Sequence, residues 1–208
     1  MKNSNNIITE FKSKAKTLES LIPIIKDAYI LPILRFNTIE YKKNEERIVK
    51  SIQTKFDSEI IIRSSGSNED NNFSSNAGEF KSILKIDIKS KSKIKSSIVE
   101  VINSFGNSAN LNDEVFIQPM LKNVDISGVI FSSDIDTLSN YYIINYDQSG
   151  STNSVTSGTS NNLKTLVHYK NYIKYSDDWI KDLINTTISL EEIFGNFYLD
   201  IEFGFKEG

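Results

Sequence analysis

The last apolar stretch of the chain, "FYLDIEFGF" (197–205), carries two carboxylates at a spacing that could hold a metal ion. Side chains of a strand alternate between two faces, so Asp200 and Glu202 would share one face and the apolar side chains the other. Carboxylates two residues apart on one face lie roughly 7 Å from each other, close enough to bracket a hard divalent cation such as Mg²⁺. The solvent-facing side of an edge strand shows the same pattern, so the strand alone leaves both interpretations open.

A second candidate is Arg63, which closes the apolar run "EIIIR" (59–63) and is followed by a loop rich in Ser, Asn and Gly (64–80). A guanidinium offers fixed donors to an oxyanion, and backbone N–H groups of such a loop can surround phosphate oxygens. An ion pair with Glu69 or Asp70 that pins the loop explains the pattern equally well. The loop is neither a Walker A motif nor a GxGxxG motif.

Histidine and serine chemistry has little support in this sequence. His168 is the only histidine, and it has no acidic neighbours in its predicted hairpin strand. We expect it to be structural or at the surface. A phosphohistidine or a Ser/His/Asp triad therefore has no other base here, and the serines around "TSG" (156–158) remain without one.

Hydrophobic periodicity predicts the elements that must position these residues. Helices are expected from about Lys14 to Pro23, over 44–56 with Asn44 as its cap, over 94–105, and from Asp178 to Gly195. Strands are expected at 59–63, 83–88, 114–121, 126–133, 141–146 and 197–205, with a hairpin turning at Lys170–Asn171. Residues 147–162 read as a loop. This mixture predicts an α+β fold with antiparallel connections.

Composition excludes several classes of function. The 208 residues carry a net charge of −3 and no cysteine, which argues against a general nucleic-acid binder, disulfides and Cys-ligated zinc. No apolar run has the length of a membrane span, and "MKNSNNIITEF" lacks the apolar core of a signal peptide. We therefore expect a soluble cytoplasmic protein that binds neither nucleic acid nor a membrane.

Four collinear stretches together resemble the N-terminal ATP-binding domain of phosphoenolpyruvate synthases, pyruvate phosphate dikinases and rifampin phosphotransferases, an ATP-grasp fold. The stretches are "IIIRSSGSNED" with "SNAGEF", "FIQPML" with "ISGVIFSSD", "INYDQSGSTNSVTSG", and "IFGNFYLDIEFGF". In that family they correspond to an "RSS…AGQ" segment, "VQPMV…SGVLFT", "INxxxGLGExVVSG" and "FGxPQDIEWA". The early "GGKGANL" segment is matched only faintly, by "SKAKTL" (13–18).

The resemblance implies a role for each residue that matches these motifs. Arg63 would contact the ATP phosphates and the transferring phosphoryl group, and Lys14 would contact the phosphates. Ser74, Ser75 and Gly78 belong to the loop over the triphosphate. Gln118, Met120 and Leu121 belong to the segment beside the adenine, whose backbone would read the base edge. Asp200 and Glu202 match the acidic pair at the nucleotide–magnesium site, so the implied cofactors are ATP and Mg²⁺.

The sequence also departs from the family pattern. "SGSTN" stands where the family has "GLGE", so that glutamate is missing and the role of the loop is in doubt. The family strand "LQxRP", the phosphohistidine domain and the pyruvate-binding barrel have no counterpart before Gly208. We therefore expect a piece of a larger enzyme, cut before the last catalytic strand of an ATP-grasp-like two-lobed domain with mixed, largely antiparallel sheets and packed helices.

These expectations lead to two functions of different classes. In the first, residues 1–116 form an N-terminal lobe with the phosphate loop, and residues 117–208 form a C-terminal lobe with the acidic strand. The two lobes would bind Mg-ATP for phosphorylation of a histidine on a separate domain of the same parent protein, which also carries the acceptor-binding domain. Alone, the piece would be inactive.

In the second function, a non-catalytic nucleotide-sensing or structural module keeps the fold; the missing glutamate favours this alternative. A β-rich carbohydrate- or protein-binding domain uses none of the motifs.

Overall fold

The chain divides into two compact units. The computed structural model describes residues 12–66, 70–71, 74–75, 81–106, 110, 112–134, 137–150, 163–172 and 174–206, with the backbone alone at 70–71 and 74–75. The N-terminal unit comprises the described residues of Phe11–Ile24 and Tyr29–Met120, and the C-terminal unit those of Ile25–Ala28 and Leu121–Gly208. Across the described residues, no helix is long and apolar enough to cross a membrane.

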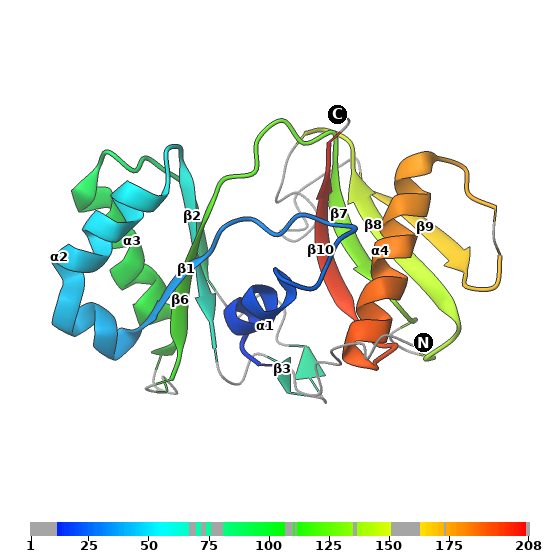
Figure 1. Cartoon of the computed structure of the whole chain (residues 1–208), viewed down its shortest axis with the longest axis horizontal. Helices are drawn as coiled ribbons and strands as arrows, with labels where there is room; N and C mark the ends of the chain where they lie inside the picture. Colours follow the sequence, from blue (N-terminus) through cyan, green and yellow to red (C-terminus); the bar gives the residue numbers. More distant parts are fainter. Residues whose placement is uncertain are drawn as a thin grey trace. The chain divides into compact units, whose positions relative to one another are not determined.

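The N-terminal unit is a four-stranded antiparallel sheet with helices on both faces (Figure 1). Its strands, in spatial order, are β1 (Leu34–Asn37), β6 (Glu114–Pro119), β2 (Ile60–Ser65) and β5 (Ser82–Ile86). Its helices are α1 (Lys14–Leu21), α2 (Thr38–Lys55) and α3 (Lys91–Ser104). A short pair, β3 (Asp70–Asn71) and β4 (Ser74–Ser75), follows β2 and is also antiparallel.

Alternation along the strands separates the two faces of this sheet. Ile60 and Ile62 of β2, with Val115 and Ile117 of β6, join the main core with α2 and α3. The side chains between them point to the opposite face, where Phe116 is buried against Ala15 of α1 in a smaller cluster. The polar side chains of the sheet therefore gather on the α1 face.

The C-terminal unit contains a second four-stranded antiparallel sheet, in the order β10-β7-β8-β9. The strands are β7 (Ile126–Phe131), β8 (Tyr141–Asp147), β9 (Lys164–Tyr169) and β10 (Asp200–Phe205), and α4 (Asp178–Phe194) packs on one face (Figure 1). The segment Ile25–Ala28 is fastened to α4, because Thr186 Oγ1 and Ser189 Oγ donate to the carbonyl and the carboxylate of Asp27 at 3.1 and 2.9 Å.

The structure confirms the predicted α+β class and the antiparallel connections of both sheets. It also confirms that α1 stops before Pro23 and that Gly195 caps α4 in the left-handed region, at φ 58°. The helix predicted from Asn44 begins earlier, at Thr38, where Asn37 and Glu40 form a capping box. Asn44 instead marks a kink inside α2, with φ −136° and ψ 32°.

Several further predictions of the elements need correction. Residues 83–88 do not alternate throughout, because a register shift in β2–β5 pairs Ile62 with Ile83 and Ile60 with Ile86, and Lys85 between them has φ 56°. After the turn at Lys170–Asn171, no strand forms in the described residues 172 and 174–176, and β9 pairs with β8 instead. β10 begins only at Asp200, and the short strand β1 escaped prediction. The lobe boundary after residue 116 stays a prediction, and β6 runs through that position.

A buried polar cluster joins the turn after β9 to α4. Glu191, 4% exposed, accepts from Lys170 Nζ at 2.5 Å and from the hydroxyl of Tyr142 at 3.1 Å. The ammonium of Lys170 also lies 4.7 Å from the centroid of the Tyr142 ring. Burial, reinforced by the charge of Glu191, raises the pKa of Tyr142 above its ordinary value.

We expect Glu191→Ala to lower the free energy of unfolding by about 3–5 kcal/mol, because it leaves the ammonium of Lys170 buried without its carboxylate. Urea denaturation would measure the change. Glu192→Ala is the matched control, since Glu192 is the next residue of α4 and is exposed. Equal stabilities of the two variants would contradict a role for the cluster.

Candidate functional site

The α1 face of the first sheet places two arginines on either side of one aromatic ring. Arg35 of β1 and Arg63 of β2 both stand directly opposite Phe116 of β6, and Ser82 of β5 stands opposite Arg63. The guanidinium carbon of Arg63 lies 5.6 Å from the centroid of the Phe116 ring. This contact holds a half-buried cation on the face that carries α1.

The first turn of α1 docks at the end of β2, two residues after Arg63. The backbone N–H of Ala15 donates to Ser65 Oγ at 3.1 Å, and Ala15 is fully buried. The hydroxyl of Ser13 donates to Glu114 Oε2 at 2.6 Å, and Lys16 Nζ lies 3.2 Å from Glu114 Oε1. Lys14 therefore sits between two anchored residues, in the same unit as Arg63 and on the same face of its sheet.

Glu114 is the centre of this arrangement. Its side chain is 5% exposed, and besides Ser13 and Lys16 it accepts from Arg35 Nη1 at 2.8 Å. Arg35 also donates through Nε to Glu19 Oε2 at 2.6 Å. That hydrogen bond, together with the charges of Glu114 and Glu19, outweighs burial and raises the pKa of Arg35. We call these residues the Glu114 network: Ser13, Lys16, Arg35 and Glu114.

In the C-terminal unit the predicted acidic pair stands on one face of β10. Asp200 and Glu202 are exposed, whereas Ile201 and Phe203 pack with the α4 core. The structure thus confirms the alternation that the sequence predicted. Two carboxylates on one open face fit a Mg²⁺ ion that keeps several waters and takes its other ligands from phosphate oxygens. Among the described residues, no group of three His, Cys, Asp or Glu side chains forms a complete protein-only metal site.

Glu202 also shares a row across the sheet with the polar side chains of β8 and β9, beyond an apolar side chain of β7. Val129 of β7 is directly opposite Glu202, Asn145 of β8 is opposite Val129, and Thr165 of β9 is opposite Asn145. Thr165 Oγ1 donates to Asn145 Oδ1 at 2.7 Å, which fixes the orientation of that amide. This face is therefore acidic along β10 and offers amide and hydroxyl groups across β8 and β9.

The segment expected beside an adenine, residues 118–121, already makes hydrogen bonds within the chain. The N–H of Met120 donates to the carbonyl of Glu59 at 2.8 Å, and Gln118 is buried with Nε2 3.4 Å from the carbonyl of Leu31. Leu121 follows at the division between the units and is 36% exposed. Ser74 and Ser75 form β4, while Gly78 lies outside the described residues. The proposed reading of a base edge thus cannot use the Met120 N–H while this bond persists.

His168 has a structural environment, as expected. It is 8% exposed, its Nε2 is 2.7 Å from the carbonyl of Tyr172, and its ring stacks on Tyr175 with centroids 5.1 Å apart. Tyr172 also bonds back to the carbonyl of Tyr169. The imidazole therefore holds the turn after β9 against the sheet.

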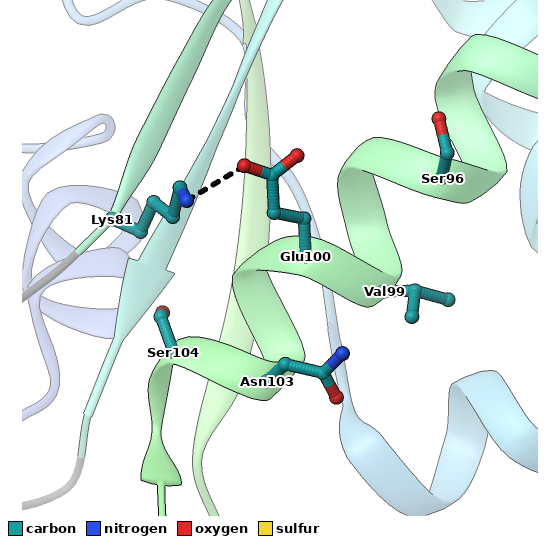
Figure 2. A pocket seen from close by; sticks show the side chains of 6 residues that line it. All are labelled: Lys81, Ser96, Val99, Glu100, Asn103 and Ser104. Atoms are coloured by element: carbon teal, nitrogen blue, oxygen red, sulfur yellow. Dashed lines mark ion pairs between the residues drawn. The ribbon is translucent and has the colours of Figure 1, made fainter.

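Two surface cavities lie away from the predicted residues. One is a groove with a volume of about 440 Å³. Figure 2 shows the side chains that line it, which are Lys81, Ser96, Val99, Glu100, Asn103 and Ser104. Its charges cancel, because Lys81 Nζ lies 2.6 Å from Glu100 and the hydrogen bond lowers the pKa of that carboxyl. A second cavity of about 320 Å³ is lined by Asp147, Gln148, Ser149, Leu163 and Lys164. Neither contains Arg63, Lys14 or the acidic pair.

Sequence reasoning missed the groups that hold the candidate residues in place. Glu114 and Arg35 carry no motif, and their partnership depends on the pairing of β1 with β6, which local periodicity does not reveal. A charged residue opening the apolar run "EVFIQPML" was the one available signal for Glu114. Likewise, no role was predicted for Asn145, which lies in the "INYDQ" stretch.

Comparisons with known proteins give only distant similarities. No protein-family model matches the sequence, and no curated protein matches it. Among solved structures, the chain is similar to VanG D-Ala:D-Ser ligase from Enterococcus faecalis, with 13% identity and a TM-score of 0.47 over 93% of this chain and 47% of that chain. It is also similar to ATP citrate lyase from Methanothrix soehngenii in complex with citrate and coenzyme A, with 12% identity and a TM-score of 0.46 over 93% and 45%.

A third similar structure is D-alanine–D-alanine ligase from Helicobacter pylori, with 13% identity and a TM-score of 0.39 over 85% of this chain and 39% of that chain. The chain thus spans less than half the length of each of these three proteins. At TM-scores this low, none of the three establishes a shared fold or a function.

We expect Mn²⁺, a paramagnetic substitute for Mg²⁺, to broaden the backbone amide signals of β10 in NMR spectra of the wild-type chain. The double variant Asp200→Asn, Glu202→Gln should lose this broadening because both carboxylate charges are gone. Asp178→Asn, Asp182→Asn is the control, since it removes two exposed acids from α4. Broadening of β10 that survives in the Asp200/Glu202 variant would remove these acids as metal ligands.

Proposed function

We propose that this chain is the ATP-binding part of a phosphotransferase that resembles phosphoenolpyruvate synthases and pyruvate phosphate dikinases. It would bind Mg-ATP so that a histidine on a separate domain of the parent protein is phosphorylated. The observation that carries the proposal is the docking of the α1 start beside the strand of Arg63, through Ala15 and Ser65. Two cations that the motif resemblance assigns to phosphates thus belong to one face of one sheet.

In this proposal the charges of the chain bind and orient the triphosphate. Arg63 would offer its planar donors to the phosphoryl oxygens, and Lys14 would add a point charge beside it. Both would offset the negative charge that develops on the phosphates during transfer. Asp200 and Glu202 would hold Mg²⁺, which supplies charge neutralisation and alignment of the phosphate oxygens.

The face of β10 supports the same proposal independently. Its two carboxylates are exposed and side by side, and Asn145, fixed by Thr165, stands in the row of Glu202. An amide in that place could donate to a nucleotide hydroxyl or a phosphate oxygen. A purely structural sheet has no need of two exposed acids on one face together with an oriented amide.

A non-catalytic nucleotide-sensing module remains the second candidate, because "SGSTN" replaces the family's "GLGE" and its glutamate. The two functions differ in chemistry but share the binding site. Positional isotope exchange in ATP, measured with the full parent protein, separates them: movement of a labelled bridging oxygen to a non-bridging position requires cleavage and re-formation of a phosphoanhydride bond. A sensing module would bind ATP without scrambling.

We expect Arg63→Ala to weaken Mg-ATP binding by about tenfold to a hundredfold, the loss of charge-assisted hydrogen bonds to phosphate. Isothermal titration calorimetry on the 208-residue chain would measure the affinity for Mg-ATP. Arg47→Ala is the matched control, because Arg47 is exposed on α2, which packs against the other face of the sheet.

Two results would overturn the assignment. Equal affinities of the wild type and Arg63→Ala would remove Arg63 from the site. A wild-type chain that binds no Mg-ATP at millimolar concentration, while remaining folded by circular dichroism, would remove the proposed function itself.

A further inference from the structure

We infer that Glu114 is a positioning residue, which fixes the first turn of α1 so that Lys14 is held beside Arg63. The inference rests on the proposed function, because that function assigns Lys14 to the phosphates of ATP. No motif points to Glu114, and its carboxylate does not itself suit a phosphate. Its role follows from the contacts of the Glu114 network alone.

The first step of the argument is that the carboxylate reaches α1 from both sides of Lys14. Ser13 Oγ donates to one oxygen at 2.6 Å, and Lys16 Nζ lies 3.2 Å from the other. The residue between Lys14 and Lys16 is held to β2 by its backbone N–H. The backbone of Lys14 therefore has a fixed position, because Ser13 and Lys16 are attached to Glu114 and Ala15 is attached to Ser65.

The second step is that Ser13 gives up its ordinary role to make this contact. Serine at the N-cap of a helix usually accepts a hydrogen bond from a backbone N–H of the first turn. Ser13 occupies the N-cap of α1 but makes no such side-chain bond, and its hydroxyl donates to Glu114 instead. The capping interaction is replaced by a tertiary one, which ties the helix start to β6.

The third step concerns the sign of the electrostatic effect. A carboxylate close to a phosphate site opposes anion binding by direct repulsion. If Glu114 acted only through its charge, its neutralisation would strengthen ATP binding. If Glu114 acts by positioning, its neutralisation loosens Ser13, Lys16 and Arg35 together and weakens ATP binding. The two roles predict opposite changes for one isosteric substitution.

The experiment compares Glu114→Gln with Glu19→Gln in the full chain, using Mg-ATP and adenosine as probes in calorimetric titrations. Glu19 is the matched control because it pairs with the same Arg35 but makes no bond to the start of α1. We expect Glu114→Gln to weaken Mg-ATP binding by about tenfold, equivalent to one charge-assisted hydrogen bond. Adenosine binding should not change, because adenosine has no phosphates for Lys14 to contact.

The possible outcomes separate the inference from the proposed function. Binding of Mg-ATP by Glu114→Gln that equals or exceeds that of the wild type overturns the positioning role while ATP binding stands. Parallel losses of ATP and adenosine binding also overturn it, since they indicate general unfolding of the unit. Absence of ATP binding in the wild type overturns the proposed function and this inference with it.

A second variant keeps the test decisive if Glu114→Gln does not fold. Ser13→Ala removes one donor from the network and leaves the buried carboxylate with Arg35 and Lys16. We expect a smaller loss of ATP affinity, about threefold, with faster amide hydrogen exchange at Ala15 than in the wild type. Unchanged exchange and unchanged affinity would contradict the inference.

Discussion

A carboxylate withdrawn from water must be surrounded by donors, and this requirement organises the α1 face of the N-terminal unit. Glu114 opens the central strand β6 and is almost wholly buried, so its two oxygens must be satisfied by groups from elsewhere. The chain supplies them from β1 and from both ends of the first turn of α1. The helix is short, so this ionic attachment adds to the apolar contact of Ala15 with Phe116 in fixing where it lies.

The period of the strands then decides what each sheet can do. One face of each sheet packs into an apolar core. The core contains α2 and α3 in the N-terminal unit and α4 in the C-terminal unit. The alternate side chains of the same strands are left for polar chemistry. In the N-terminal unit these include arginines around an aromatic ring, and in the C-terminal unit they include two acids and an amide beside apolar side chains of β7.

The local elements were largely predictable from the sequence, because helical stripes and strand alternation are properties of neighbouring residues. The errors lie where a longer-range contact overrides the local pattern. Asn44 has the chemistry of a cap, yet the capping box at Asn37 starts the helix first. The bulge at Lys85 depends on pairing with β2, and the strand expected after Asn171 loses to the pairing of β9 with β8.

The candidate site divides in the same way. The sharing of a face by Asp200 and Glu202 follows from period two alone, and the sequence predicted it. Arg63 was recognisable as a cation that follows an apolar run, although β2 continues past it to Ser65. The partnership of Glu114 with Ser13 and Arg35 was not recognisable, since it joins residues about a hundred positions apart through a sheet order that the sequence does not state.

The short segment Ile25–Ala28 has a consequence for how the chain can be divided. It belongs to the C-terminal unit, although α1 before it and β1 after it belong to the other. Within the described residues the polypeptide therefore crosses between the units three times, at 24–25, 28–29 and 120–121. Neither unit is a contiguous piece of sequence, so a domain swap, an excised gene fragment or a proteolytic cut at one point would carry part of one unit away with the other.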